Sequence, residues 1–390
     1  MLVAVPKESH PGETRVALTP AAAASLAKQK LEVAIEPGAG AAAGFSDAEY
    51  QKNGARLAAD RGALLSSAQL ILQVRVSGDG ADIQNMKSGQ IVIGHADPLT
   101  PGPALPALAK AGATVLAVEL IPRITRAQAM DALSSQANLA GYSAVVLAAR
   151  HLPRIFPMLM TAAGTIKPAR VFVIGAGVAG LQAIATARRL GAVVHAFDVR
   201  PAVKEQVQSL GARFVELPLE IKDAEDKGGY AKQQSAEQLR KQQELMGNVV
   251  AASDVVITTA LIPGQKAPLL VSADMVRRME PGAVIVDLAA EKGGNCELTV
   301  PDQIVQREGV TVIGLTNLPA MVPYHASQMY ANNLLKLVQL IVNKEGSSAL
   351  DTADEIIAGA LVCRGGEIVN PRVRQAQNSM KPQMDIDERR

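Results

Sequence analysis

The sequence lacks several features, and each absence excludes a class of protein. It contains no tryptophan and only two cysteines, Cys296 and Cys363. Two cysteines so far apart in the chain predict neither a disulfide framework nor a zinc site. We expect them to be small buried thiols in a reducing compartment, and we predict no metal site.

Long hydrophobic runs are also missing. No window approaches the ~18 unbroken apolar residues that are needed to cross a bilayer. Met1 leads directly into the strand-like segment 2–5, without the basic and apolar regions of an export signal. The 39 Lys and Arg residues almost balance the 37 Asp and Glu residues, so the charge indicates neither a nucleic acid nor an anionic membrane surface as a partner. We therefore expect a cytoplasmic protein.

What the sequence does contain indicates an α/β fold. Hydrophobic residues make up 48% of the 390 positions, aromatic residues only 3%, and glycine occurs 32 times. This composition is typical of parallel sheets that are buried beneath helices on both faces. A chain of this length is expected to form two or three domains.

Two series of short apolar strands alternate with helical stretches. The first series has expected strands at 2–5, 31–35, 70–74, 91–94 and 114–118, and helices at 20–30, 47–54 and 103–111. The second begins at Arg170, with strands at 171–174, 193–197, 213–215, 255–259, 283–287 and 310–313. Helical periodicity over 126–151 and 321–344 predicts two long helices that join the domains.

This pattern predicts two Rossmann-like, doubly wound parallel-sheet domains separated by a cleft. The second long helix leads back to residues that must pack somewhere, which predicts a discontinuous N-terminal domain built from residues 1–135 plus 320–370. A nucleotide-binding domain at 136–319 is then inserted in it. Residues 371–390 are assigned to a C-terminal tail, because most of this segment is polar and lacks periodicity.

The sharpest motif follows the expected strand at 171–174. It reads Gly175-Ala-Gly177-Val178-Ala179-Gly180 and leads into an apolar helix. In a Gly-x-Gly-x-x-Gly unit the first glycine permits a tight turn, the second lets the backbone approach a pyrophosphate, and the third allows close packing of helix on strand. The N-terminus of the helix offers free N–H groups to the phosphates.

An acidic residue completes this dinucleotide motif. Asp198 follows the next strand, where a ribose-binding carboxylate belongs. An ordinary acid at a strand end is the alternative, but strand, glycines, helix, strand and acid all coincide here. Because a carboxylate repels a 2′-phosphate, we predict NAD(H) rather than NADP(H). The sequence has no P-loop, His-Glu-x-x-His or Gly-x-Ser-x-Gly motif that would indicate an ATPase, a zinc protease or a hydrolase.

With the segments Pro6-Lys7-Glu8, 15–20 and 365–370, these motifs resemble the alanine dehydrogenase/transhydrogenase family over nearly the whole chain. The closer match within the family is the NAD(H)-binding portion (domain I) of the alpha subunit of proton-translocating NAD(P) transhydrogenase. Segment 122–142 resembles the transhydrogenase signature, in which four polar side chains surround the nicotinamide. The resemblance assigns these roles to Arg123, Gln128, Asp131 and Ser134.

The spacing of Gln128, Asp131 and Ser134 predicts that they share one helix face. Periodicity alone would favour a solvated polar face, and only the resemblance supports the functional interpretation. The resemblance also implies contacts to NAD(H) from Asn138, Val199, Arg200, Ala260 and Leu261, and from Gly229 and Tyr230 in a stretch that resembles the family's mobile loop. A surface loop without function is the alternative for that stretch. Segments 258–264 and 286–294, at strand ends, are expected to form cofactor-site loops.

Alanine dehydrogenase is the alternative within the family. Where that enzyme has a Lys-Val-Lys run, this sequence reads Gln73-Val-Arg75, and the acid of a later loop is Glu291. Arg15 and His95 match substrate-site residues of the dehydrogenase, so this alternative stays open. A non-catalytic NADH-responsive binding module is the other alternative.

The resemblance to transhydrogenase implies a partner-dependent enzyme that is inactive alone. Hydride would pass from NADH to NADP(H) bound on a partner subunit, coupled to proton movement across a membrane. The chain is expected to be a homodimer that docks on NADP(H)-binding and membrane-spanning subunits at the cytoplasmic face of the inner membrane, without inserting itself. Transfer between two nicotinamide rings requires positioning rather than acid–base chemistry, so the four signature residues are interpreted as orienting groups.

Overall fold

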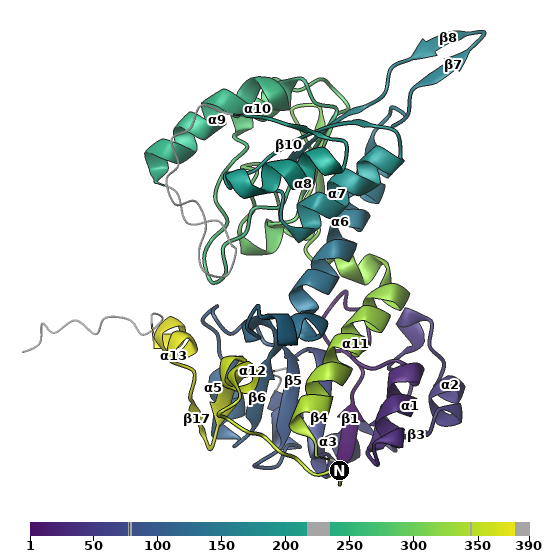
Figure 1. The fold of residues 1–390 in the computed structure, drawn as a ribbon, viewed down its shortest axis with the longest axis vertical. Helices are drawn as coiled ribbons and strands as arrows, with labels where there is room; N and C mark the ends of the chain where they lie inside the picture. Colours follow the sequence, from purple (N-terminus) through teal and green to yellow (C-terminus); the bar gives the residue numbers. More distant parts are fainter. Residues whose placement is uncertain (77, 79, 217–234, 344, 379–390) are drawn as a thin grey trace, which may run out of the picture. The chain divides into compact units, whose positions relative to one another are not determined.

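The computed structural model describes residues 1–76, 78, 80–216, 235–343 and 345–378. It divides into two compact units, Met1–Gln136 with Val322–Arg390 and Ala137–Met321, called units 1 and 2 below (Figure 1). One boundary falls within helix α6 (Ala132–His151), and the other falls just before helix α11 (Pro323–Ile341).

Unit 1 is built on an eight-stranded sheet with the order β17-β16-β6-β5-β4-β1-β2-β3. Strands β1 to β6 are parallel, and β16 and β17 add to the edge in antiparallel fashion. The strands are β1 (Leu2–Val5), β2 (Glu32–Ile35), β3 (Ala55–Leu57), β4 (Leu70–Arg75), β5 (Ile91–His95), β6 (Thr114–Ala117), β16 (Leu361–Arg364) and β17 (Glu367–Ile368).

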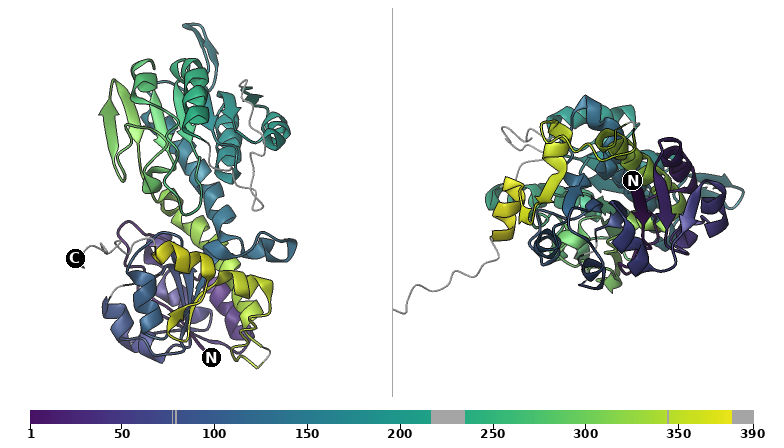
Figure 2. Two further views of the ribbon diagram at one scale, coloured as in Figure 1. Left: turned by 90° about the vertical axis from the view of Figure 1, so that its left-hand side faces the viewer. Right: turned by 90° about the horizontal axis from the view of Figure 1, so that it is seen from below.

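Both faces of this sheet are buried, which is why its strands consist of continuous apolar runs. Val3 and Leu72 pack on one face with Leu26 and Leu334, whereas Ile71 packs on the opposite face with helices α3 and α5. Figure 2 shows helices on both sides of the strands. The helices are α1 (Pro20–Lys28), α2 (Asp47–Lys52), α3 (Arg61–Ser67), α4 (Gly80–Gln84), α5 (Ala104–Lys110), α11, α12 (Glu355–Ala360) and α13 (Pro371–Asn378).

Unit 2 contains a seven-stranded sheet with the order β11-β10-β9-β12-β13-β15-β14, in which only the edge strand β14 is antiparallel. The strands are β9 (Arg170–Ile174), β10 (Val193–Phe197), β11 (Arg213–Phe214), β12 (Val255–Thr258), β13 (Val284–Asp287), β14 (Ile304–Arg307) and β15 (Val310–Ile313). Helix α7 (Val178–Arg189) covers one face together with part of α6, and α9 (Ala236–Ala251) and α10 (Ala273–Arg277) cover the other. The described part of unit 2 also contains α8 (Lys204–Ser209) and the hairpin strands β7 (Leu159–Thr161) and β8 (Gly164–Ile166).

The parallel strands of both units follow the Rossmann order 3-2-1-4-5-6. In unit 1 this order is β3-β2-β1-β4-β5-β6, and in unit 2 it is β11-β10-β9-β12-β13-β15. The prediction of Rossmann-like α/β sheets is therefore confirmed. The order reverses between β1 and β4 and between β9 and β12, and ligands of open α/β sheets bind at the carboxyl ends of such strands.

Two expected segments differ from the structure. The helix expected over 126–151 is interrupted, because a 3₁₀ segment, η3 (Thr125–Met130), precedes α6, which begins only at Ala132. The tail expected from residue 371 begins with a helix, because α13 buries Val373 in the core of unit 1, and Gln377 accepts a hydrogen bond from the Gly102 N–H at 3.1 Å. The other 3₁₀ segments are η1 (Ala41–Ala43), η2 (Val118–Leu120), η4 (Pro201–Val203), η5 (Ala290–Lys292) and η6 (Leu318–Met321). No helix in the described part of the chain is long and apolar enough to span a membrane.

Candidate functional site

The glycine-rich turn of unit 2 connects β9 to α7. Gly175 has a φ of 98°, which a residue with a side chain adopts only under strain. A Cβ atom at Gly180 would lie 1.9 Å from the carbonyl oxygen of Gly175. Both positions therefore require glycine for the turn and for the packing of α7 on the sheet.

The middle glycine leaves the turn open. A Cβ atom at Gly177 would meet, among the described residues, only the Arg200 guanidinium, at 3.9 Å. Gly177 is the N-cap of α7 and Val178, the first residue of the helix, is exposed, with Ala179 partly buried behind it. An open turn at a helix N-terminus presents N–H groups and a partial positive charge, which is an environment that suits phosphate groups.

The predicted ribose-binding carboxylate is buried and fully engaged. Asp198 Oδ2 accepts hydrogen bonds from the Ala176 N–H at 2.7 Å and from a terminal nitrogen of Arg200 at 2.9 Å. Oδ1 accepts from the backbone N–H of Arg200 at 2.8 Å and from its Nε at 2.9 Å. Asp198 thus ties the end of β10 to the glycine-rich turn, and Val199 beside it packs against the core of unit 2.

The loop after β12 is held by a residue that the sequence motifs did not single out. Asn295 is fully buried, and its side chain accepts from the Ala260 N–H at 3.0 Å and donates to the Ala260 carbonyl at 2.9 Å. It also donates to the Pro268 carbonyl at 2.8 Å. Leu261, the next residue of the loop, is 41% exposed. The loop thus exposes the apolar side chain of Leu261, next to the backbone of Ala260 that Asn295 holds in place.

A second buried carboxylate supports this arrangement. Asp287 ends β13, has no exposed surface and accepts five hydrogen bonds of 2.7–3.0 Å. Their donors are the hydroxyls of Thr258 and Thr299 and the backbone N–H groups of Ala289, Asn295 and Cys296. Asp287 lies in a loop that was predicted from the sequence, but its role as an anchor for Asn295 depends on contacts that only the fold provides.

The signature residues of unit 1 do not share one helix face. Gln128 lies in η3, and Asp131 interrupts the helix with a ψ of 84°. Its carboxylate accepts hydrogen bonds from the Ser134 backbone N–H at 2.9 Å and from the Ser134 hydroxyl at 2.6 Å, and so caps the first turn of α6. The prediction of a shared helix face was wrong, because a spacing of three residues is compatible with both a continuous helix and a capped break.

A buried amide on α11 fixes the position of this segment. Asn333 donates to the carbonyl of Ala129, next to Gln128, at 2.9 Å and accepts from the Ser135 hydroxyl at 2.7 Å. Gln128 and Arg123 are themselves exposed on unit 1. No sequence motif pointed to Asn333, because its partners lie about 200 residues away in the chain.

Unit 1 also contains a buried charge cluster at the carboxyl ends of its strands. Arg15 donates from Nε and a terminal nitrogen to Glu13, at 2.8 and 2.7 Å, and from its other terminal nitrogen to Gln136 at 2.8 Å. Arg75 Nε lies 3.7 Å from the same Glu13 carboxylate. An acid of the chain itself, Glu13, thus lies against the positive charges of both Arg15 and Arg75.

Glu8 occupies the switch point of unit 1. Its carboxylate accepts from the backbone N–H groups of Val74 and Arg75 at 2.6 and 3.1 Å. Burial raises the pKa of the Glu8 carboxyl to about 7, and the two backbone hydrogen bonds and Arg15 oppose this shift only in part. Nearby, His95 Nδ1 lies 3.6 Å from Glu119, and its ring stacks on Tyr330 with centroids 5.4 Å apart.

The remaining predicted residues are Asn138, Gly229 and Tyr230. Asn138 lies on α6, in unit 2, and is partly buried. Gly229 and Tyr230 lie outside the described residues. Among the described residues, no group of three or more His, Cys, Asp or Glu side chains could hold a metal ion.

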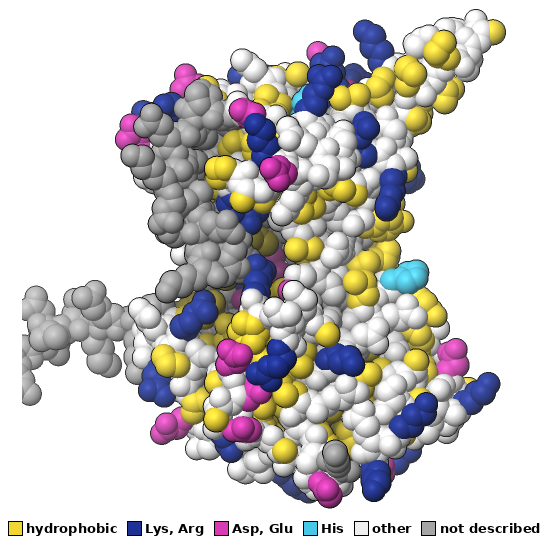
Figure 3. All heavy atoms as spheres, in the orientation of Figure 1, with side chains coloured by type: hydrophobic (Ala, Val, Ile, Leu, Met, Phe, Trp, Pro, Cys, Tyr) yellow, Lys and Arg dark blue, Asp and Glu magenta, His cyan; other side chains and the backbone are white. Residues whose placement is uncertain are grey.

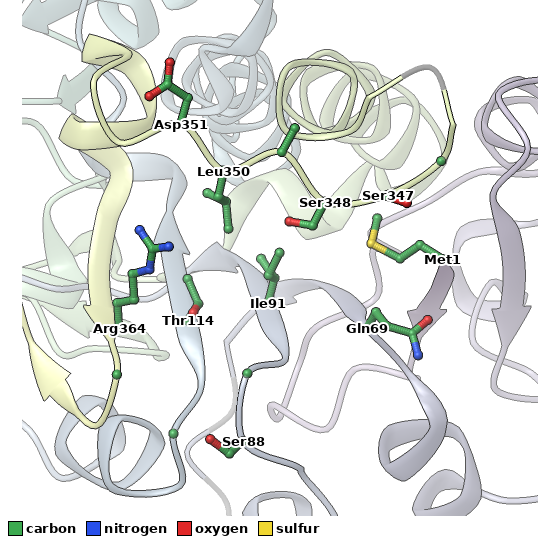
Figure 4. A pocket seen from close by; sticks show the side chains of 15 residues that line it. Met1, Gln69, Ser88, Ile91, Thr114, Ser347, Ser348, Leu350, Asp351 and Arg364 are labelled. Atoms are coloured by element: carbon green, nitrogen blue, oxygen red, sulfur yellow. The ribbon is translucent and has the colours of Figure 1, made fainter.

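A cavity of about 990 Å³ opens at the amino ends of the strands of the unit 1 sheet. Its lining includes Met1, Gln69, Ile91 and Thr114, which lie just before or at the start of β1, β4, β5 and β6. Figure 4 shows Thr114 beside Arg364 on the neighbouring strand β16. The cavity therefore lies at the amino ends of the strands, away from the edge at which open α/β sheets bind ligands.

These features together define a Rossmann-type nucleotide-binding protein. Two family models match the chain: alanine dehydrogenase/PNT, N-terminal domain, over residues 4–140, and alanine dehydrogenase/PNT, C-terminal domain, over residues 144–371. The chain belongs to the alanine dehydrogenase/PNT family, and the resemblance expected from the sequence is confirmed.

Similar proteins include both branches of this family. The chain is 47% identical to the first portion of NAD(P) transhydrogenase subunit alpha from Rhodospirillum rubrum, over 95% of this chain and 98% of that protein. A solved structure of transhydrogenase from Sinorhizobium meliloti matches with a TM-score of 0.82 and 43% identity, over 95% of this chain and 99% of that one. A structure of L-alanine dehydrogenase matches with a TM-score of 0.82 and 27% identity, over 98% and 100%.

The first prediction concerns Asp287. The variant Asp287→Asn has an NH₂ group in place of an oxygen that accepts several hydrogen bonds. The buried donors of those bonds are then left without an acceptor. We expect a loss of about 3 kcal/mol or more in the free energy of unfolding, measured by urea denaturation. Asp274→Asn, on an exposed side chain of α10, is the matched control and should change stability by less than about 0.5 kcal/mol. A loss at Asp287 as small as the control's would contradict the anchoring role.

The second prediction uses the raised pKa of Glu8. Because the folded state holds the proton up to about pH 7 and the unfolded state releases it near 4.5, stability should fall as the pH rises between these values. From pH 6 to pH 8 the free energy of unfolding of the unaltered chain should fall by about 1 kcal/mol more than that of Glu8→Gln, whose side chain stays neutral throughout. Thermal unfolding across this pH range measures the difference. The exposed Glu205→Gln should keep the pH dependence of the unaltered chain, and an equally steep profile in Glu8→Gln would refute the assignment.

Proposed function

We propose that the chain is the NAD(H)-binding subunit of a proton-translocating transhydrogenase, active only together with partner subunits. The observation that carries this proposal is the open glycine-rich turn with Asp198 beside it. The chain that contains this turn is similar over 95% of its length to the first portion of an NAD(P) transhydrogenase alpha subunit. In this proposal hydride passes from NADH to NADP(H) held by a partner subunit, and the transfer is coupled to proton movement across a membrane. The chain lies at the cytoplasmic face of that membrane through its partners.

The chain's own residues fit a dinucleotide at this turn. Among the described residues, only Arg200 lies within 4 Å of the position that a Cβ atom would take on Gly177, which leaves room for a pyrophosphate at the N-terminus of α7 beside Val178 and Ala179. We assign the ribose to Asp198 and further contacts to Val199, Arg200, Asn138, Ala260, Leu261, Gly229 and Tyr230.

Positioning is the task of the signature residues in this proposal. NADH, when bound, supplies the hydride, and no side chain has to take or give a proton on the reacting carbon. Asp131 holds the Ser134 hydroxyl and backbone at 2.6 and 2.9 Å, and Asn333 holds the backbone beside Gln128. Gln128, Arg123, Asp131 and Ser134 therefore act as orienting groups on a rigid segment.

Alanine dehydrogenase is the second candidate, because a structure of that enzyme matches 98% of the chain. The charge cluster of unit 1 favours the transhydrogenase instead. Arg15 is bound by Glu13 and Gln136, and β4 carries Gln73 and Arg75 rather than lysines. A substrate carboxylate would have to displace the buried Glu13 from Arg15, which is costly because Glu13 would lose the side-chain hydrogen bonds that it accepts from Arg15 at 2.8 and 2.7 Å.

We also propose that the chain forms a homodimer through the β7–β8 hairpin. The hairpin projects from unit 2, and Figure 3 shows hydrophobic side chains along it. Met158 and Met160 are 58% and 74% exposed, and Ile166 is 50% exposed. A two-stranded hairpin is only marginally stable alone and exposes a costly apolar surface, which a second copy of the same hairpin region would cover.

The third prediction tests the enzymatic proposal. The purified chain should bind NADH, oxidise it negligibly with pyruvate and ammonia, and catalyse hydride transfer only after an NADP(H)-bearing transhydrogenase partner is added. Gln128→Asn, one methylene shorter, should lower the transfer rate about tenfold or more with nearly unchanged NADH affinity, because its proposed role is alignment. Gln51→Asn on the exposed face of α2 is the matched control and should leave the rate unchanged.

Each outcome of this experiment has a definite meaning. Robust alanine-dependent reduction of NAD by the chain alone would establish the dehydrogenase instead. NADH binding without activity after any partner is added would favour the non-catalytic module. An unchanged transfer rate in Gln128→Asn would remove that residue from the mechanism.

The fourth prediction concerns the dimer. The double variant Met158→Glu/Met160→Glu places charges on the exposed apolar surface of the hairpin. Sedimentation equilibrium should show a dimer for the unaltered chain and a weakening of about a hundredfold or more in the double variant. Ile304→Glu, on the exposed edge strand β14, should remain dimeric. A monomeric unaltered chain, or a dimer insensitive to the double variant, would rule out the hairpin interface.

A further inference from the structure

Arg200 holds the carboxylate that the proposed function assigns to the ribose. A carboxylate offers about four acceptor positions, and Asp198 receives four N–H groups. Two of these come from the backbone of Ala176 and Arg200 and are fixed by the fold. The other two belong to a single guanidinium, so one side-chain rotation would release half of the acceptor positions of Asp198.

The same guanidinium lies beside the open face of the glycine-rich turn. The nitrogen that donates to Asp198 Oδ2 is 3.9 Å from the position that a Cβ atom would take on Gly177. Arginine binds phosphate oxygens in the same bidentate way as it binds a carboxylate. Arg200 therefore lies within reach of two anions, one provided by the chain and one that a bound pyrophosphate would provide.

We infer that Arg200 exchanges Asp198 for the pyrophosphate of the ligand, and so makes the site select nucleosides that carry a diphosphate over nucleosides alone. This inference rests on the proposed nucleotide site and adds a specificity-determining residue to it. In the chain without ligand, the Arg200 guanidinium is hydrogen-bonded to the carboxylate of Asp198, which is assigned to the ribose. When a pyrophosphate enters the turn, the guanidinium turns toward it, and two positions of Asp198 become available to the ribose hydroxyls.

Charge compensation explains the selectivity. The Arg200 and Asp198 side chains are 13% and 5% exposed, so that neither charge is well solvated. A nucleoside offers only neutral hydroxyls, so binding it to Asp198 would separate Arg200 from this carboxylate without supplying a second anion in its place. A diphosphate supplies that anion. The cost of opening the ion pair is thus offset only by ligands that contain both groups.

The exchange predicts a thermodynamic coupling between two fragments of the ligand. In the unaltered chain, saturating inorganic pyrophosphate should tighten adenosine binding about fivefold or more, because pyrophosphate draws Arg200 away from Asp198. Competition of adenosine against NADH fluorescence, corrected for the effect of pyrophosphate on NADH itself, measures the adenosine affinity. A static Arg200 would give no coupling, and this result would overturn the inference.

Variants of Arg200 provide the second arm. Arg200→Met should bind adenosine several-fold more tightly and ADP about tenfold more weakly, with no effect of pyrophosphate on adenosine. Arg200→Lys keeps a positive charge beside Asp198 and is the variant to measure if Arg200→Met fails to fold. It should show a reduced coupling between pyrophosphate and adenosine. Arg189→Met, an exposed residue at the end of α7, is the matched control and should behave like the unaltered chain.

The results separate this inference from the proposed function. If the unaltered chain binds NADH and ADP but shows no coupling, or if Arg200→Met weakens adenosine and ADP equally, the exchange is refuted while the nucleotide site stands. If the unaltered chain binds neither NADH nor ADP, both are refuted.

Discussion

The loops at the carboxyl ends of the parallel strands depend on buried carboxylates that bind backbone N–H groups. A loop that crosses such an edge leaves the regular hydrogen-bonding pattern of the sheet, and its buried N–H groups need acceptors elsewhere. Asp287, Asp198 and Glu8 each provide such an acceptor, for between two and three backbone N–H groups. Asp131 does the same at the start of α6. The positions of several proposed binding residues follow from these bonds. Asp198 fixes the backbone of Arg200, Asp131 fixes that of Ser134, and Asp287 holds Asn295, which in turn holds Ala260.

The two units show what this constraint permits with the same strand order. In unit 2 the switch point is occupied by Gly175–Gly180, where the described residues leave Gly177 open, and the carboxylate lies one strand away in Asp198. In unit 1 the switch point is filled by Glu8, whose burial raises its pKa to about 7. A carboxylate of the chain at this position opposes the binding of an anionic ligand, and this difference supports the assignment of the dinucleotide to unit 2.

Apolar strands could be predicted from the sequence because both faces of each sheet are buried, and the expected bounds 2–5, 193–197 and 310–313 agree with β1, β10 and β15. The break at Asp131 could not be predicted from the sequence, because the spacing of Gln128, Asp131 and Ser134 is the same in a continuous helix and in a capped one. Asn333 and Asn295 act through contacts with residues far away in the chain, and neither lies in a motif. Helix α13 buries one side chain, Val373, and a single apolar residue in a polar segment gives no periodicity from which a helix could be predicted.

Two arginine–carboxylate pairs with the same local geometry illustrate how context decides their roles. In Glu13–Arg15 and in Asp198–Arg200 the arginine follows the acid by two residues, and its backbone N–H, Nε and one terminal nitrogen all donate to that acid. Arg15 is fixed further by Gln136 and is only 4% exposed, within a cluster that contains other charges. Arg200 borders the turn that Gly177 leaves open. Arg15 and Glu13 can separate only by disrupting this buried cluster, whereas Asp198 and Arg200 lie where an incoming anion can take the place of the carboxylate. The same motif therefore serves as a fixed support in unit 1 and as an exchangeable contact in unit 2.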